Sequence, residues 1–132
     1  MSTALQLEVV TPDKQVVSES VDYVSCPGVD GEFGVLKSHV ALLSALKIGV
    51  LRFDKEGKQD FVFISGGFAD VNDNVVTVLA ESAELAKDID KARAEEAKKR
   101  AEERLSAKAD NINHVRASLA LQRALVRLNL AS

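Results

Sequence analysis

The chain has 132 residues, of which 46% are hydrophobic, and its formal net charge is −3. This length predicts one ordinary domain, or one small domain with an appendage. No stretch of about 18 apolar residues is present that could cross a membrane as a helix, and the first residues lack the pattern of a secretory signal. Cys26 is the only cysteine, so no internal disulfide can form, which suits a reducing compartment. The two histidines are far apart and no spacing typical of a structural zinc site is present.

Charge and composition change together near residue 85. Residues 1–84 hold 6 Lys+Arg and 13 Asp+Glu, a net charge of −7, whereas residues 85–132 hold 11 and 7, a net charge of +4. Every glycine, proline and aromatic residue lies within residues 1–68. We therefore expect two domains of different architecture, residues 1–84 and residues 85–132.

The first domain is expected to consist of short strands. Alternating or β-rich apolar segments are separated by turn signals such as TPDK (11–14), DKEG (54–57) and NDN (72–74). This spacing predicts a small antiparallel β-sandwich or barrel. The segments expected as strands are 5–9, 17–24, 49–53, 60–64, 65–71 and 75–80.

The first domain shows no catalytic motif. The glycine-rich GVDGEFG (28–34) lacks the Gly-Lys-Ser/Thr of a phosphate loop, and no serine or cysteine lies in a nucleophile elbow. His39 could be a catalytic or contact residue, but a loop histidine at a packing corner is the simpler interpretation. From motifs alone, this domain is expected to be a binding or assembly module.

The second domain is expected to be an antiparallel helical hairpin. The first helix is predicted over 86–106, with Asp88 as its N-cap and Asp90 at the positive end of its dipole. The polar segment KADNIN (108–113) is expected as a turn, and the second helix over 113–130. The expected apolar stripes are Ala94, Ala97, Ala101 and Leu105 on the first helix, and Ala117, Ala120, Leu121, Ala124, Leu125 and Leu128 on the second. Because this seam is rich in alanine and thin, the pair needs to dock on something and could dock again on a second partner.

Arginines border both apolar stripes. Arg93, Arg100 and Arg104 on the first helix, and Arg116, Arg123 and Arg127 on the second, share the spacing i, i+7, i+11. One interpretation is a solvated face with ion pairs such as Glu96–Arg100, which we prefer for Lys98, Lys99 and Arg104. For Arg93, Arg123 and Arg127 we expect contact with a phosphate or a carboxylate-rich partner. Nucleic acid is a weaker interpretation, because this domain has no aromatic residue to stack on bases and the chain is acidic.

Several strings resemble the epsilon subunits of bacterial F-type ATP synthases. They are LEVVTPD (7–13), GEFGVLKSHVALLSALKIGVLRF (31–53), FISGGFADV (63–71), VVTVLAESAE (75–84) and IDKARA (89–94), and the resemblance covers essentially the whole chain. Ala41 departs from the family, which usually has proline there. The resemblance implies an α+β fold, an N-terminal antiparallel β-sandwich followed by a C-terminal antiparallel two-helix hairpin.

The resemblance also implies a function as a non-catalytic rotor subunit. The sandwich would bind the gamma subunit and the ring of c subunits, with Glu32 as a c-ring contact and His39 at the gamma- and ring-facing end. The hairpin would permit ATP hydrolysis when folded on the sandwich and block it when extended into the alpha/beta catalytic head. The implied place is the cytoplasmic face of the bacterial plasma membrane, peripheral and as part of the synthase that couples ATP to protons. No cofactor is implied as obligatory.

IDKARA matches a family pattern that in some members binds regulatory ATP and holds the hairpin folded. The positions that match nucleotide contacts of those members are Glu84, Ile89, Asp90, Arg93, Ala94, Arg100, Arg123 and Arg127. The alternative is that the motif only caps the helix and packs the hairpin.

Two other functions are kept as alternatives. A free-standing ATP-sensing module would use Asp90 and the arginines to close its hairpin on nucleotide. A small enzyme would use His39 with a nearby carboxylate, but no nucleophile or metal constellation supports it.

Overall fold

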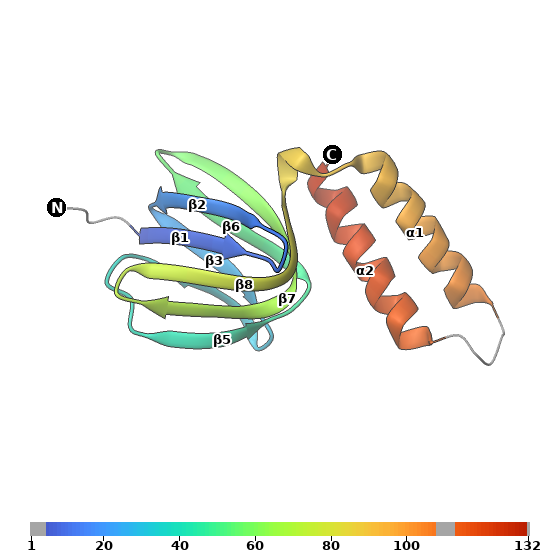
Figure 1. Ribbon diagram of the computed structural model, residues 1–132, viewed down its shortest axis with the longest axis horizontal. Coiled ribbons are helices and arrows are strands. Elements are labelled where there is room, and N and C mark those ends of the chain that lie inside the picture. The colour runs from blue at the N-terminus through green and yellow to red at the C-terminus, as the bar shows by residue number, and fades with distance from the viewer. Residues whose placement is uncertain (1–4, 108–112, 132) are drawn as a thin grey trace. The chain divides into compact units, whose positions relative to one another are not determined.

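The computed structural model describes residues 5–107 and 113–131 and has the predicted α+β order, strands followed by two helices (Figure 1). The chain divides into two compact units, Met1–Leu85 and Ala86–Ser132. The first unit contains all the described strands and the second contains all the described helices.

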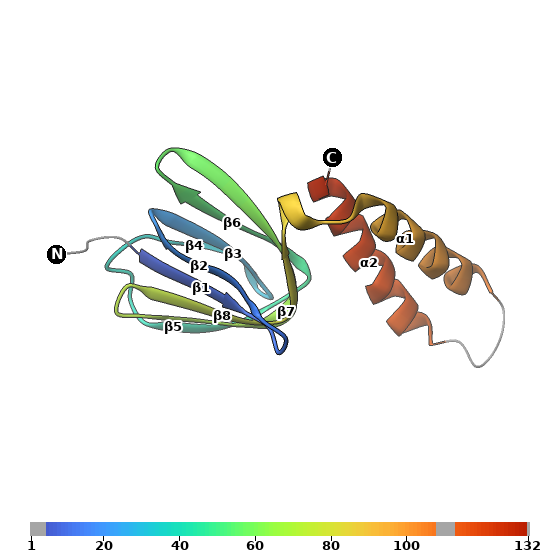
Figure 2. The same cartoon turned by 45° about the horizontal axis from the view of Figure 1, so that its top comes forward.

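The first unit is built from eight strands that form one continuous network of hydrogen-bonded pairs. They are β1 (Leu5–Val10), β2 (Gln15–Val21), β3 (Tyr23–Gly28), β4 (Gly31–Val35), β5 (Leu42–Leu46), β6 (Gly49–Lys55), β7 (Lys58–Asn72) and β8 (Val75–Leu85). Their order is β2-β1-β8-β7-β5-β3-β4, and β6 pairs with β3 and β7. The network therefore curves back on itself as a sandwich that closes over one core (Figures 1 and 2).

The strand pairing is antiparallel with one exception. β1 runs parallel to β8, with Leu7 opposite Val76 and Val9 opposite Val78. All the other pairs are antiparallel, from the β1–β2 hairpin to the β7–β8 hairpin. The prediction of a sandwich is confirmed, and the parallel pair joins the first strand of this unit to its last strand, β8.

The strands predicted over 60–64 and 65–71 are one strand, β7, that does not stop at Gly66 and Gly67. Its first half pairs with β6 and its second half with β5, while β8 pairs along both halves. Gly66 has φ +70° and Gly67 has φ +116°, values that L side chains rarely adopt. The glycine pair thus bends the strand from one layer to the other, and the prediction that the strand ends there was wrong.

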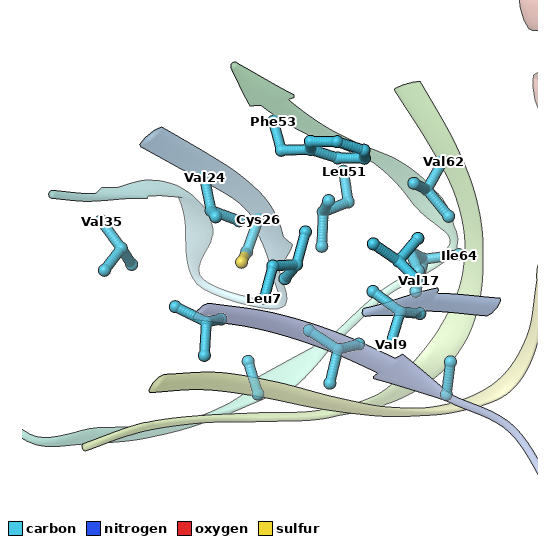
Figure 3. Close-up of a cluster of buried hydrophobic side chains, with 14 of the residues drawn as sticks. Leu7, Val9, Val17, Val24, Cys26, Val35, Leu51, Phe53, Val62 and Ile64 are labelled. Atoms are coloured by element: carbon cyan, nitrogen blue, oxygen red, sulfur yellow. The ribbon is translucent and has the colours of Figure 1, made fainter. Parts of the chain in front are cut away.

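The core of the first unit is aliphatic and aromatic, and it lies between the strand layers (Figure 3). Leu7, Leu51 and Phe53 are completely buried, and each such side chain contributes about 1.5–3 kcal/mol of hydrophobic stabilisation. Cys26 belongs to the same cluster, and its burial raises the pKa of the thiol to about 12. The cysteine therefore acts as a small core residue.

The second unit contains the short 3₁₀ helix η1 (Ala86–Asp88) and the helices α1 (Lys91–Ser106) and α2 (His114–Ala131). Asp90, not Asp88, is the N-cap of α1, and its carboxylate accepts a hydrogen bond from the Arg93 backbone N–H at 3.0 Å. The predicted N-cap was wrong because the 3₁₀ turn delays the start of the α-helix. The Asn113 side chain accepts in the same way from the Arg116 N–H at 3.0 Å and caps α2. Most of the predicted turn, residues 108–112, lies outside the described residues.

The two helices are antiparallel neighbours, as both views show (Figures 1 and 2). The buried residues of the hairpin are Ala94 and Ala101 on α1, and Ala117 and Ala124 on α2. The alanine seam is therefore confirmed. Leu125, predicted in the stripe, is 46% exposed, because a seam of small residues brings the helices close and covers only a narrow face of each.

Candidate functional site

Each buried alanine of the hairpin seam is preceded in the chain by an arginine. The pairs are Arg93–Ala94, Arg100–Ala101, Arg116–Ala117 and Arg123–Ala124. One residue advances an α-helix by about 100°. Every one of these arginines therefore lies about a quarter turn from the seam, always in the same rotational sense. Arg104 and Arg127 precede the half-buried Leu105 and Leu128 and continue the two rows.

The two arginine rows lie on the same side of the hairpin. Both helices are right-handed and they run in opposite directions, so the residue before a seam position projects to the same flank from either helix. We call this side the arginine flank, made of Arg93, Arg100, Arg104, Arg116, Arg123 and Arg127. The two arginine rows therefore lie on one side of the hairpin because the alanines that follow the arginines are buried in the seam.

The spacing of the buried alanines also sets the level of each arginine along the hairpin. Ala94 and Ala101 are seven residues apart, as are Ala117 and Ala124. In an antiparallel pair this matched spacing places Ala94 opposite Ala124 and Ala101 opposite Ala117. The contact between η1 and α2 agrees with this register, because η1 is then level with the end of α2.

This register divides the arginine flank into two groups. Arg93 lies level with the segment between Arg123 and Arg127, so these three residues lie at the η1 end of the hairpin. Arg100 lies one heptad further along α1, about 10 Å away, and is level with Arg116. The predicted ATP residues on the two helices are thus brought to one flank, but Arg100 is not level with the other arginines.

The arginine flank consists of six cations, and carboxylates lie beside it on one helix only. α2 has no aspartate or glutamate, whereas Glu96 and Glu103 of α1 follow Arg93 and Arg100 by three residues. Within the described residues, no ion pair joins Arg93, Arg100 or Arg123 to a carboxylate, and the predicted Glu96–Arg100 pair does not form. Arg93 and Arg100 are exposed and Arg123 is half-buried. Their guanidinium groups therefore remain available to an anion.

The remaining residues of the IDKARA motif lie where α1 begins. The Ile89 N–H donates to the Ala86 carbonyl at 3.3 Å, and the Ala94 N–H donates to the Asp90 carbonyl at 3.0 Å. Asp90 caps the helix with one carboxylate oxygen. The motif therefore has a structural role whether or not it binds a ligand, and Asp90 lies at the same end of the hairpin as Arg93.

Glu84 belongs to the other unit. It lies near the end of β8, where it pairs in register with Phe63. The seven other predicted nucleotide contacts lie in the second unit, from Ile89 to Arg127.

The two predicted contact residues of the sandwich do not come together. Glu32 is exposed in β4, opposite Pro27 and next to the β3–β4 turn. His39 is half-buried in the loop beyond the other end of β4, where its ring nitrogen Nδ1 bonds to the Val40 carbonyl oxygen at 2.6 Å. Ser38 beside it is bonded to Asn74 of the β7–β8 turn. The two residues therefore mark opposite ends of β4.

Arg116 was not among the predicted nucleotide contacts, although it lies level with Arg100 on the arginine flank. The signal was present in the sequence as four Arg-Ala pairs with the same seven-residue spacing on each helix. Arg104, assigned to a solvated face, is also on the flank.

The part of the chain that the structure describes contains no group of three or more His, Cys, Asp or Glu that could hold a metal ion. None of its helices is long and apolar enough to cross a membrane.

The same division into sandwich and helices appears in known protein families. Residues 4–86 match the family model described as "ATP synthase, Delta/Epsilon chain, beta-sandwich domain", and residues 87–132 match "ATP synthase, Delta/Epsilon chain, long alpha-helix domain". The chain is similar to the ATP synthase epsilon chain of Nitratidesulfovibrio vulgaris strain DP4, with 59% identity over 98% of this chain and 97% of the relative. It is also similar to that of Desulforamulus reducens, with 46% identity over 99% of both chains.

A solved structure has the same fold. The chain superposes with a TM-score of 0.77 and 28% identity on a chain from the Euglena gracilis mitochondrial ATP synthase, described as OSCP/F1/c-ring in rotational state 1. The match covers 92% of this chain and 78% of that one. The chain therefore belongs to the ATP synthase delta/epsilon chain family, as a bacterial F-type epsilon subunit that is a non-catalytic part of the synthase.

Proposed function

We propose that this subunit belongs to the central stalk of a proton-translocating synthase, where it couples the catalytic head to the c-ring, and that its hairpin inhibits ATP hydrolysis and binds regulatory ATP. The observation that carries the regulatory part is the arginine flank, in which no carboxylate pairs with Arg93, Arg100 or Arg123 within the described residues. A surface of this kind accepts either a nucleotide triphosphate or a carboxylate-rich protein segment.

ATP fits the η1 end of the flank best. Arg93, Arg123 and Arg127 lie at this end, and Arg93 and Arg123 can offer paired N–H donors to phosphate oxygens. Asp90 supplies a carboxylate at the same level, which can accept from a ribose hydroxyl or the adenine amine. Ala94 leaves space at this position, and Arg100 lies at a distance that suits the far end of an extended ligand. Ile89 would complete the site.

Charge explains how ATP would hold the hairpin folded. Packing the helices brings two arginine rows together, and their mutual repulsion opposes a seam that only small side chains stabilise. An anion bound between the rows removes that repulsion only when both helices are in place. Binding to the folded hairpin alone stabilises it by mass action, and the hairpin opens as ATP falls.

The opened hairpin would use the same arginines for inhibition. Once separated, the two helices present basic rows that can pair with an acidic segment of the alpha/beta head. ATP and the head would then compete for the same guanidinium groups. The sandwich stays on the rotor, with Glu32 toward the c-ring and His39 at the end that faces the gamma subunit and the ring. The subunit would thus lie at the cytoplasmic face of the plasma membrane, peripheral, through the complex.

Titration calorimetry with ATP tests the regulatory site. The full chain should bind ATP, and Arg123→Ala or Arg93→Ala should weaken binding by about 1.5–3 kcal/mol, the range for hydrogen bonds to charged groups. Lys99→Ala is the matched control, because Lys99 is an exposed cation on the other side of α1. Equal affinities for wild type, Arg123→Ala and Lys99→Ala would remove the flank from the site.

Addition of the subunit to a catalytic head purified without it tests the inhibition. The wild-type chain should lower the rate of ATP hydrolysis, and a variant with Arg93, Arg100 and Arg116 all changed to alanine should lower it less. If the wild-type chain neither binds this head nor changes its rate, the proposal fails. A free-standing ATP sensor has no support comparable to the full-length similarity with synthase subunits.

A further inference from the structure

One serine of the sandwich has a backbone conformation that its residue type disfavours. Ser38 has φ +66°, and the His39 N–H donates to the Leu36 carbonyl oxygen at 3.2 Å, which closes a turn with Ser38 at its third position. A turn with positive φ at this position normally carries glycine or asparagine there. The other described non-glycine residues with positive φ lie in the two-residue turns of the β6–β7 and β7–β8 hairpins and are Glu56, Asp73 and Asn74. Ser38 is therefore an exception whose cause lies outside its own turn.

The Asn74 side chain supplies this cause. The Ser38 N–H donates to Asn74 Oδ1 at 2.6 Å, and the two residues are 36 positions apart in the chain. The Asn74 carbonyl oxygen also accepts from the Gln6 N–H at 2.8 Å. Asn74 thus joins the loop 36–41, between β4 and β5, to the β7–β8 turn and to β1. Because asparagine tolerates positive φ, it can occupy the β7–β8 turn and hold Ser38 at the same time.

The loop 36–41 has little packing that could fix its shape. Leu36 and Val40 are 61% and 76% exposed, and a segment with few buried apolar contacts opens easily. Among the described residues, Asn74 is the only one outside the loop whose side chain forms a hydrogen bond with it. The loop carries His39, the predicted contact residue, directly after Ser38. The position of His39 therefore depends on the Ser38–Asn74 bond.

We propose that Asn74 is a positioning residue, whose side chain holds Ser38 in the left-handed conformation and so fixes loop 36–41 in the shape that the rotor partner binds. Ordering a loop before binding lowers the free energy that binding itself must supply. The inference rests on the proposed function, in which the His39 end of the sandwich faces the gamma subunit and the ring. It adds to that end a residue from a different turn of the sandwich.

Three variants separate the side-chain bond from the turn in which Asn74 lies. Asn74→Gly removes the acceptor but keeps a residue that favours positive φ and the carbonyl that binds Gln6, so the β7–β8 turn should persist. Asn74→Asp keeps an oxygen that can accept from Ser38. Asp22→Ala is the matched control, because the Asp22 carboxylate accepts at 3.0 Å from the N–H of Glu56, a positive-φ residue in the turn before β7.

Hydrogen exchange of the full-length chain measures the Ser38–Asn74 bond directly. The Ser38 amide should exchange about threefold to tenfold faster in Asn74→Gly than in wild type, the factor expected for the loss of one hydrogen bond. It should exchange at the wild-type rate in Asn74→Asp and in Asp22→Ala. Asn74→Gly should keep the wild-type melting temperature, because its turn and the core are unchanged. Equal exchange of the Ser38 amide in wild type and Asn74→Gly would refute the proposal.

Binding of each full-length chain to a synthase from which this chain has been removed tests the positioning role. Asn74→Gly should bind about threefold to tenfold more weakly than wild type, because only chains with an ordered loop are competent to bind. Asp22→Ala should bind as wild type does. If Asn74→Gly exchanges faster but binds with wild-type affinity, or if Asp22→Ala loses as much affinity, the positioning role is refuted and the proposed function stands. If wild type itself does not bind, the proposed function fails.

Discussion

Replacing Gly67 with alanine should destabilise the sandwich far more than the same change at another positive-φ glycine. Gly67 has φ +116°, and an added Cβ would collide with the Leu79 carbonyl oxygen and lie 2.8 Å from the Ala80 Cα. Both are backbone atoms of the paired strand, so no side-chain rotation can relieve the collision. Gly57→Ala is the matched control, because Gly57 has φ +81° but nothing within 4 Å of the added Cβ.

The expected magnitude has two parts. An alanine in a sparsely populated backbone region costs about 1–3 kcal/mol, and this cost applies to both variants. Displacing the packed backbone of β8 adds about 1–3 kcal/mol at Gly67 only. Gly67→Ala should therefore lose about 2–6 kcal/mol of unfolding free energy, and Gly57→Ala only about 1–3 kcal/mol.

Urea unfolding followed by tyrosine fluorescence measures this difference. Tyr23 is the only tyrosine and the chain has no tryptophan, so the signal reports the sandwich alone. For a unit of this size, 1 kcal/mol corresponds to about 4–8 °C of melting temperature, so the two variants should also separate clearly on heating. Equal losses for Gly67→Ala and Gly57→Ala would refute the close approach of β7 to β8.

Three further perturbations have defined outcomes. Asp90→Ala should remove about 1 kcal/mol from α1 and lower the helical circular dichroism signal, whereas Asp88→Ala should leave it unchanged; the reverse result would restore the predicted cap. Cys26 should resist thiol reagents in the folded protein. The folded pKa of the Cys26 thiol, about 12, exceeds the ordinary 9.0, so the thiol ionises first in the unfolded chain and the free energy of unfolding falls as pH rises from 9.0 toward 12. Cys26→Ala should lose less stability than wild type over this pH range. Equal losses for wild type and Cys26→Ala would contradict the burial of the thiol. Ala101→Leu should overpack the seam and destabilise the hairpin by about 1–3 kcal/mol, whereas Lys99→Leu should leave its stability unchanged. Thermal unfolding followed by the helical circular dichroism signal measures the difference, and equal stabilities of the two variants would contradict the tight seam.

The sequence alone could predict most of the second unit, because a helix is a local structure. The seven-residue spacing of Ala94, Ala101, Ala117 and Ala124 predicts the seam. The polar stretch between the helices predicts the reversal. The start of α1 was predicted at the wrong aspartate, since the 3₁₀ turn over Ala86–Asp88 cannot be distinguished from a first α-helical turn by composition.

The residue types of the candidate site were visible in the sequence, but which arginines lie level with one another along the hairpin was not. The spacing of Arg93, Arg123 and Arg127 was visible in the chain. Arg100 lies one heptad from Arg93 and level with Arg116. This placement depends on the antiparallel register of the helices, which the buried alanines set. The spacing of residues within one helix does not determine which residues of the other helix lie beside them.

The sequence by itself determined the two-part organisation, the alternation of the short strands, the alanine seam and the Arg-Ala repeat, because each depends on neighbours within about one heptad. Only the tertiary structure decided the parallel pairing of β1 with β8, the continuity of β7 through Gly66 and Gly67, and the outward position of Phe68. Carried through from Val62 and Ile64, simple alternation would point Phe68 into the core. The positive φ values of the two glycines shift that alternation, and they are tolerated because β8 pairs along both halves of β7 and holds the bend in place.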